Sequence, residues 1–363
     1  MSSLKLPVSI TVLILGKEWF YGNMESLNVL IARKLTPELL ALTEDASLGM
    51  TPIYDPAFSS VEVSDSLDRH PKTDVLFTIN GPDRWSPSWR LRWIQLSFAG
   101  AEHLVWGVIP PNLPVTTASG ANSVAMAEHA FALILALRRR INLIMELQAE
   151  RRWPERRERW FSFAVPLLRD QTLGILGYGA IGREIGRLGA AFGMRVLAYK
   201  RNPQEKSDTG YYLPGTGDPL GVIPERYYGP SELREFFAES DVVVNILPAT
   251  KETEGLVDGP ALRAMKPEAL FVNIGRGSTV REEDLIDVLT SKTIAGAALD
   301  VTAAEPLPPE NPLWRIPNVI VGPHVGGFFA EYDRSCILLL KENLRRFRSG
   351  EALLNPVNRG LGY

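Results

Sequence analysis

Four ionisable side chains follow three short apolar segments in the last third of the chain. Arg276 comes after the run Phe-Val-Asn-Ile-Gly, and His324 lies in Gly-Pro-His-Val-Gly-Gly after another run. Between them, Asp300 ends a third run and Glu305 follows it. Active sites of open parallel sheets lie beyond the carboxyl ends of the strands, so these ends would bring the groups together. Histidine exchanges a proton near neutral pH, which makes His324 the acid–base candidate. The convergence favours chemistry over a structural salt-bridge network.

The chain has four histidines, and the other three occupy less suitable positions. His70 precedes a proline in a polar stretch, which is typical of a surface loop. His129 lies in an apolar helical segment beside Glu128, which favours a structural role. His103 follows the small residues at 99–101, and we expect it to pack behind a glycine loop.

A glycine-rich motif with the spacing G-x-G-x-x-G lies between an apolar segment and a helical segment. Its residues are Gly177, Tyr178, Gly179, Ala180, Ile181 and Gly182. In a dinucleotide fold the first glycine permits a tight turn, the second lets backbone amides approach a pyrophosphate, and the third allows helix and strand to pack closely. The helix N-terminus then faces the anion. This context indicates a bound dinucleotide rather than an ordinary turn.

The next apolar segment, residues 195–199, ends at Lys200 and Arg201, where the adenosine ribose is expected. NAD-binding folds usually carry Asp or Glu at this position. A carboxylate repels a 2′-phosphate, whereas lysine and arginine attract it, and arginine can bind it through two hydrogen bonds. The alternative is a pair of solvated cations at a strand end. We expect NADP as the cofactor, with NAD less preferred.

Length and composition are those of a globular protein of about two domains, with 363 residues, 45% of them hydrophobic and 22% charged. The net charge of −3 provides no basic field for nucleic acid. Cys336 is the single cysteine, so no intrachain disulfide can form and a reducing compartment is expected. No apolar run is long enough to cross a bilayer. We therefore expect a cytoplasmic protein that binds neither nucleic acid nor a membrane.

Apolar patterning in the first third predicts short strands and helices in alternation. Strands are expected at residues 8–15, where β-branched residues alternate, and at 74–78 and 93–96. An amphipathic helix is expected at 24–42, with a break near Pro37.

The remainder of the chain predicts a parallel sheet covered by helices on both faces. A strongly apolar helix is expected at 123–137, and a solvated, charged helix at 138–159, where Trp153 and the adjoining Trp160 point to a partner subunit. Strands are expected at 172–176, 195–199, 242–247, 270–273, 295–299 and 319–321. Residues 207–230, rich in Gly, Pro and Tyr, predict a long loop.

Longer motifs follow one another in a distinctive order: LGILGYGAIGREIG, NIGRG, ALDVTAAEPLP and NPLWRIPNVIVGPHVGG, then ENLRRF and LLNPVNRGLGY. In these motifs the chain resembles the D-isomer-specific 2-hydroxyacid dehydrogenases, in particular their NADP-preferring 2-keto acid reductases of the glyoxylate/hydroxypyruvate type. The resemblance covers about residues 70–363.

The resemblance implies hydride transfer from NADPH to a 2-keto acid, giving a D-2-hydroxy acid in a reversible reaction. Arg276 would bind the substrate carboxylate and polarise the keto oxygen, and protonated His324 would give that oxygen a proton. Glu305 would hydrogen-bond His324 and favour its charged form. Backbone amides at Ala99 and Gly100 would hold the substrate carboxylate.

The same resemblance implies the cofactor contacts. Asp300 would contact the nicotinamide carboxamide, and Asn245, Leu247 and Pro248 would line the adenosine side. Further cofactor contacts are expected at Ile274, Gly275, Arg276, His324 and Gly326. No metal is expected.

The implied fold is α/β with two domains. A Rossmann-type, doubly wound parallel sheet at 118–328 binds the cofactor and is inserted into a smaller flavodoxin-like α/β substrate domain, residues 1–117 plus 329–363. The active site lies in the cleft between them. The resemblance also implies a homodimer joined partly through 123–160.

Some residues depart from the family pattern. The loop at 207–230 is longer than usual and would cover the cofactor, and Glu102 replaces the usual aspartate of the substrate loop. Four aromatic residues either line a large apolar pocket or belong to the core between the domains: Trp85, Trp314, Phe328 and Phe329.

Two rival functions remain on the same fold. One is a phosphite-type dehydrogenase; formate dehydrogenases pair the histidine with glutamine, so Glu305 argues against formate. The other is a cofactor-sensing corepressor, which is a binding protein that keeps the catalytic residues.

Overall fold

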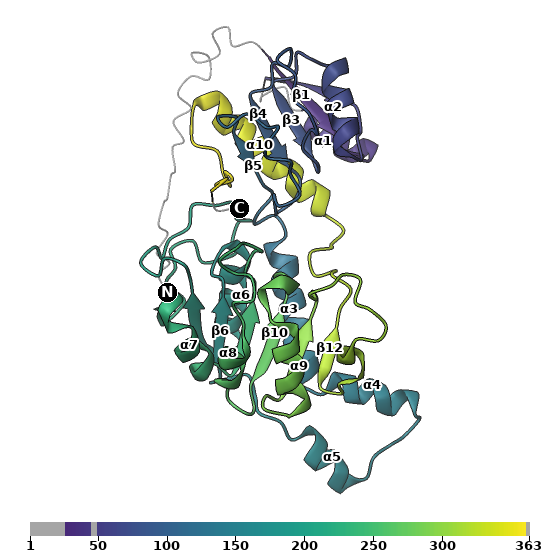
Figure 1. Ribbon diagram of the computed structural model, residues 1–363, viewed down its shortest axis with the longest axis vertical. Helices are drawn as coiled ribbons and strands as arrows, with labels where there is room; N and C mark the ends of the chain where they lie inside the picture. Colours follow the sequence, from purple (N-terminus) through teal and green to yellow (C-terminus); the bar gives the residue numbers. More distant parts are fainter. Residues whose placement is uncertain (1–25, 45–48, 361–363) are drawn as a thin grey trace, which may run out of the picture.

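The computed structural model describes residues 26–44 and 49–360. Two parallel sheets lie in two separate bodies of the molecule (Figure 1). The strand predicted at 8–15 falls outside the described residues. Within the described part, no helix is long and apolar enough to cross a membrane.

The first sheet has five parallel strands in the order β2-β1-β3-β4-β5. They are β1 (Leu27–Ala32), β2 (Met50–Tyr54), β3 (Val75–Thr78), β4 (Trp93–Leu96) and β5 (Val115–Thr116). The helices of this body are α1 (Pro37–Thr43), α2 (Ser60–Arg69) and the C-terminal α10 (Tyr332–Ser349). The buried face of α10 packs with β1 and β3 in one apolar core, so the last helix of the chain returns to the first sheet.

The helix predicted at 24–42 is wrong over its first half, because β1 occupies that part. Leu30 and its neighbours are buried on both faces of the sheet, and β1 pairs with β2 on one side and β3 on the other. An interior parallel strand is apolar on both faces, so its pattern resembles that of a buried helix. The helix begins only at Pro37, after Thr36 caps its N-terminus. The predicted strands at 74–78 and 93–96 are found.

The second sheet has seven parallel strands in the order β12-β11-β10-β9-β6-β7-β8. They are β6 (Thr172–Leu176), β7 (Arg195–Tyr199), β8 (Arg226–Tyr228), β9 (Val242–Asn245), β10 (Leu270–Asn273), β11 (Gly296–Leu299) and β12 (Val319–Val321). All six predicted strands are found, with β9 two residues shorter at its end and β11 starting one residue later. The order reverses between β6 and β9, and such a reversal leaves a crevice for a ligand.

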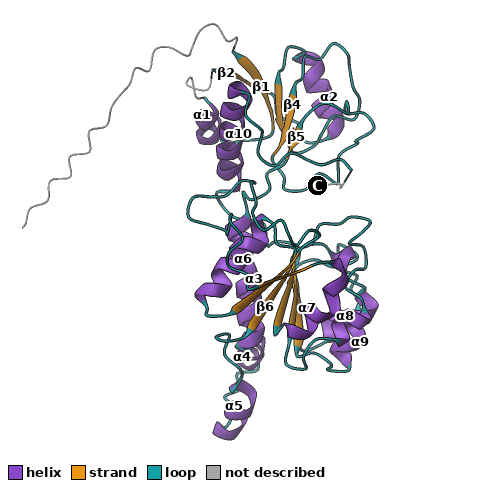
Figure 2. Ribbon diagram, turned by 90° about the vertical axis from the view of Figure 1, so that its left-hand side faces the viewer, coloured by secondary structure: helices purple, strands orange, loops and turns teal. Residues whose placement is uncertain are grey.

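Helices cover both faces of the second sheet, as the pattern predicted (Figure 2). On one face α3 (Ser123–Arg138) and α6 (Ala180–Ala191) form a core with the sheet. On the other face, the core contains side chains of α7 (Leu233–Glu239), α8 (Gly259–Arg263) and α9 (Glu282–Thr290). This is the doubly wound architecture expected from the sequence.

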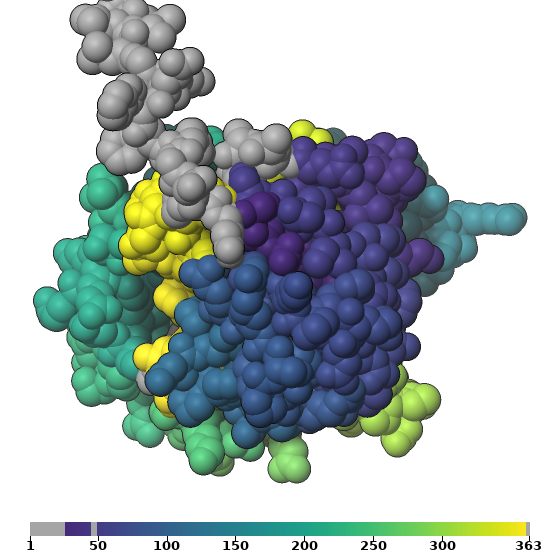
Figure 3. Space-filling model, turned by 90° about the horizontal axis from the view of Figure 1, so that it is seen from above, coloured from purple at the N-terminus to yellow at the C-terminus, as the bar shows by residue number. Residues whose placement is uncertain are grey.

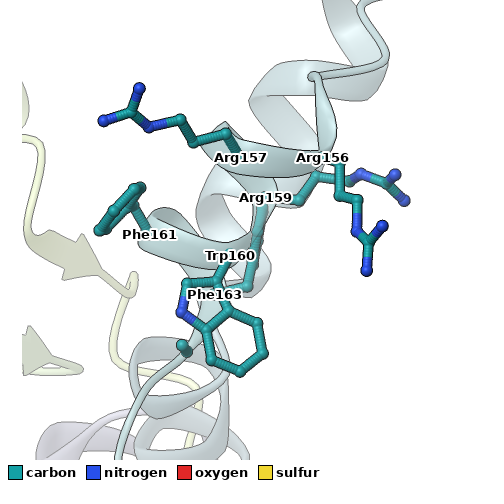
Figure 4. Close-up of a pocket in the computed structure, with 7 residues that line it drawn as sticks. Arg156, Arg157, Arg159, Trp160, Phe161 and Phe163 are labelled. Atoms are coloured by element: carbon teal, nitrogen blue, oxygen red, sulfur yellow. The ribbon is translucent and has the colours of Figure 1, made fainter.

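The charged stretch after α3 forms two helices rather than one, α4 (Ile141–Ala149) and α5 (Arg156–Phe163). They make an arm that projects from the second body, also visible beyond the outline of the molecule from above (Figure 3). Every residue of α5 is at least partly exposed, and Trp160 and Phe161 are 72% and 74% exposed. Figure 4 shows these rings beside the arginines of α5. Apolar rings this exposed on a projecting helix are typical of an interaction surface.

The long segment between β7 and β8, residues 200–225, is held by side chains that contact it. The loop predicted at 207–230 ends earlier, because β8 and a 3₁₀ turn follow. Fully buried Arg183 of α6 donates to Asp218 O at 2.5 Å and to Lys206 O at 2.6 Å. Farther along, Tyr211 N donates to Asn355 Oδ1 at 3.0 Å, and its ring packs against the core of the first body. The segment therefore joins both bodies.

Candidate active site at the ends of the parallel strands

The glycine-rich turn after β6 has the geometry that a pyrophosphate requires. Gly177 has φ +106°, which favours glycine. A Cβ on Gly182 would lie 2.3 Å from Gly177 O, whereas a Cβ on Gly179 would meet nothing within 4 Å. No side chain caps the first amides of α6, which begins at Ala180, so these donors are left for an anion. Tyr178 and Ile181 are directed elsewhere: the Tyr178 hydroxyl donates to Asp218 Oδ2 at 2.8 Å, and Ile181 packs with the core.

The two cations after β7 lie as the sequence places them, but both already have contacts. The Lys200 ammonium donates to Glu205 O, and Arg201 Nη2 is 4.0 Å from Glu252 Oε2. Burial, and then the charge of Arg183, lowers the pKa of Lys200. Lys200, Arg201 and the nearby Arg183 place three positive charges close to the end of β7. Such a cluster suits a dianionic phosphate group better than a neutral hydroxyl.

The segment after β9 is shaped by a buried asparagine. Asn245 Nδ2 donates to Asn273 Oδ1 at 3.0 Å and to Thr279 Oγ1 at 2.8 Å, while its Oδ1 accepts from Leu247 N at 3.2 Å. A Cβ on Gly275 would lie 2.8 Å from Leu247 O. Asn245 therefore uses its polar atoms within the protein and directs the backbone that leads to Pro248.

The acid–base candidate pairs with a carboxylate. His324 Nδ1 lies 2.8 Å from Glu305 Oε2, and both side chains are roughly half exposed. The other oxygen, Glu305 Oε1, accepts from Thr302 N at 3.2 Å. His324 has φ +56°, which is uncommon for a residue with a side chain, and its N–H donates to Asp300 O at 2.8 Å. The loop after β12 thus holds the ring in a defined place.

The Asp300 side chain is buried and braces the same loop. Its Oδ1 accepts from Val325 N at 3.0 Å and its Oδ2 from Gly326 N at 2.8 Å. Burial would raise the pKa of Asp300, but the neighbouring His129 ring and the hydrogen bonds from Val325 N and Gly326 N together hold it below its usual value. The carboxylate is charged at neutral pH and is held by the protein itself.

The arginine after β10 makes a contact that the sequence analysis did not assign. Arg276 Nε and Nη2 donate to Glu102 Oε1 at 3.2 and 2.8 Å, and Nη1 donates to Gly275 O at 2.9 Å. Among the described residues these contacts use three of the five N–H bonds, so one remains on each terminal nitrogen. A carboxylate can bind such a pair through both oxygens.

Glu102 lies in the loop after β4 of the first sheet, so its ion pair with Arg276 joins the two bodies. It lies over the loop expected to hold a substrate, since a Cβ on Gly100, next to Ala99, would be 2.0 Å from Glu102 Oε2. Burial would raise the pKa of Glu102, but Arg276 lowers it below its usual value. In the sequence, this ion pair was indicated only by the presence of an acidic residue in a loop of small residues.

The other histidines and the aromatic candidates are placed as follows. His103 Nε2 is 2.8 Å from Ile79 O, and His70 Nε2 is 3.3 Å from Asp55 Oδ2. Trp85 packs edge-on against Trp89, and Phe329 against Tyr332. By contrast, the side chains of Trp314 and Phe328 are exposed, at 52% and 79%. The described residues contain no cluster of His, Cys, Asp or Glu that could hold a metal ion.

A seven-stranded doubly wound sheet with an uncapped glycine turn at its switch point, and charged groups at the neighbouring strand ends, defines a dinucleotide-dependent oxidoreductase. Residues 131–326 match the sequence model of the D-isomer specific 2-hydroxyacid dehydrogenase, NAD binding domain. This match spans more than half of the chain, and the chain belongs to that family.

Relatives of known description match over most of the chain. A glyoxylate reductase of Aeropyrum pernix is 31% identical over 352 residues, covering 93% of this chain and 97% of its own. A hydroxypyruvate reductase of Blautia hydrogenotrophica is 27% identical over 325 residues, covering 86% and 92%. The solved structure of a D-isomer specific 2-hydroxyacid dehydrogenase from Xanthobacter autotrophicus Py2, in complex with NADPH and MES, superposes with a TM-score of 0.73 at 26% identity, covering 94% and 100%.

Proposed function

We propose that the protein is an NADPH-dependent 2-keto acid reductase that forms a D-2-hydroxy acid. The observation that carries this proposal is the pairing of His324 with Glu305 at 2.8 Å, on the sheet that also presents Arg276. A proton donor and a carboxylate-binding group are the two protein groups that reduction of a 2-keto acid requires.

Each residue has a defined task in this reaction. The remaining N–H bonds of Arg276, with the amides at Ala99 and Gly100, bind the substrate carboxylate and polarise its keto group. Glu305 accepts the Nδ1 proton, which leaves the Nε2 proton of His324 for the keto oxygen. When bound, the reduced nicotinamide supplies the hydride for the carbonyl carbon. The hydroxyl hydrogen of the product is the proton given up by His324.

The cofactor is proposed to lie along the carboxyl ends of the second sheet. The glycine turn and the first amides of α6 hold the pyrophosphate, and Lys200 and Arg201 hold the 2′-phosphate. The adenosine side is lined by the segment from Asn245 through Leu247 to Pro248. The nicotinamide half is bordered by Ile274, Gly275, Asp300 and Gly326.

The assembly is proposed to be a homodimer with the active site between two domains. The cofactor domain would span 118–328, and the substrate domain 1–117 and 329–363, in line with the two sheets and the returning α10. The exposed rings of the α4–α5 arm supply an apolar surface for a second copy of the chain.

The test is a set of initial rates for NADPH and NADH oxidation with glyoxylate, hydroxypyruvate, pyruvate, a branched keto acid and phenylpyruvate. We expect turnover with at least one of them and a preference for NADPH. Changing His324→Ala should lower the rate by ~10²–10⁴-fold. Tight cofactor binding without turnover of any keto acid would refute the reductase and favour a sensor, and oxidation of phosphite would reassign the substrate.

A further inference from the structure

His129 is a histidine of α3 that the proposed reaction does not use. It lies on the apolar helix against one face of the second sheet, and its place in the sequence indicates only a structural role. Its Nε2 atom is buried and has no hydrogen-bond partner among the described residues. The acidic atom beside it is Asp300 Oδ1, at 3.3 Å, so a small shift of either side chain would let the ring donate its proton there.

Asp300 connects this histidine to the loop of the proposed proton donor. Its carbonyl oxygen accepts from His324 N, and its two carboxylate oxygens accept from Val325 N and Gly326 N. These three bonds surround a residue at φ +56°, a conformation that persists only where neighbouring groups hold it. The position of His324 therefore depends on the position of the Asp300 carboxylate.

The packing leaves the carboxylate no alternative site. A Cβ on Gly326 would lie 2.8 Å from His129 Cδ2 and 2.9 Å from Asp300 Oδ2, so ring, carboxylate and loop backbone are in direct contact. The Asp300 side chain is 1% exposed, and solvent cannot replace a missing donor there. Its charge must be balanced by the protein groups around it, and His129 is a side chain beside it that is able to donate a proton.

We propose that His129 is a positioning residue for His324 and acts through Asp300. With its proton on Nε2, the ring donates to Oδ1 and holds the carboxylate in the orientation that both loop amides need. Without this donor the buried carboxylate reorients, the two amides lose their common acceptor, and the His324 ring leaves its contact with Glu305. The inference rests on the proposed function only where it treats His324 as the proton donor. The effect of His129 on the position of the His324 ring does not depend on that function.

The experiment compares four variants of the full-length protein. His129→Leu removes the donor, His129→Gln keeps an N–H near the Nε2 position, and His129→Asn keeps an amide that is too short to reach Asp300. His70→Leu is the matched control, because His70 also lies 3.3 Å from an aspartate, Asp55, in the other body of the molecule. Thermal unfolding shows whether each variant is folded, and if His129→Leu is not, His129→Asn takes its place.

The first readout is kinetic. We expect kcat to fall tenfold or more in His129→Leu and His129→Asn, with KM for the keto acid changing less than threefold, because the substrate contacts at Arg276 remain. His129→Gln should recover most of the loss, and His70→Leu should behave as the wild type. Equal kcat in all four variants overturns the proposal, as does a loss in His129→Leu that His129→Gln fails to recover.

The second readout does not need a substrate. The chain has four histidines, so selective labelling gives four Cε1–Hε1 signals that single substitutions can assign. We expect the His324 signal to shift or broaden in His129→Leu, to return in His129→Gln and to stay unchanged in His70→Leu. If the wild type reduces no keto acid, the proposed function fails while this readout still decides the coupling. An unmoved His324 signal in His129→Leu refutes it.

Discussion

Replacing Glu305 by glutamine tests the pairing on which the proposed reaction depends. Glu305 Oε1 accepts from Thr302 N, so the amide introduced by Glu305→Gln would keep its carbonyl oxygen there and turn its NH₂ group towards His324. An NH₂ group cannot accept the Nδ1 proton, and the charged imidazole loses its acceptor. A hydrogen bond to a charged group stabilises its partner by about 1.5–3 kcal/mol. Because both side chains of this pair are about half exposed, we expect a value at the lower end of that range. About 1.5 kcal/mol corresponds to roughly a tenfold loss in kcat/KM at neutral pH.

The assay is the initial rate of NADPH oxidation with the best keto acid, over a range of substrate concentrations. The control is Glu310→Gln, which makes the same chemical change five residues away without touching His324, and should leave the rate unchanged. We expect the loss in Glu305→Gln to fall mainly on kcat, because the substrate carboxylate binds elsewhere. A rate within twofold of the wild type would refute the role assigned to Glu305.

Three further predictions concern other parts of the site. Changing Lys200→Asp together with Arg201→Ala should move the ratio of kcat/KM values from NADPH towards NADH; an unchanged ratio would remove both residues from the 2′-phosphate site. Arg276→Lys loses the paired terminal nitrogens and should raise KM for the keto acid at least tenfold; wild-type affinity would contradict bidentate binding. Trp160→Ser with Phe161→Ser should convert a dimer to monomers in light scattering, and an unaltered mass would exclude the arm as the interface.

Local sequence alone predicted the cofactor-binding turn and the strands around it. The spacing of Gly177, Gly179 and Gly182 acts within one strand–turn–helix unit, so its meaning does not depend on distant parts of the chain. The positions of Arg276 and His324 followed from one general property, that parallel strands gather their carboxyl ends at the same edge.

The two wrong secondary-structure predictions, the helix at 24–42 and the end of the loop at 207–230, share a physical cause. Residues 27–32 are apolar on both faces because other strands and helices enclose them. The local sequence does not show which elements will pack against a segment, so a buried strand could not be told from a buried helix. The loop at 207–230 was assigned from its Gly, Pro and Tyr content, but β7 supplies the partner that makes β8 a strand.

The amino-acid sequence by itself determined the family, the fold class and the residues with reactive side chains. Only the tertiary structure decided which of them meet. Glu102 and Arg276 are 174 residues apart, and His129 reaches Asp300 from a helix on the face of the sheet. Periodicity and spacing report on neighbours within a few residues, whereas an ion pair between distant residues forms only after two sheets and their helices have packed.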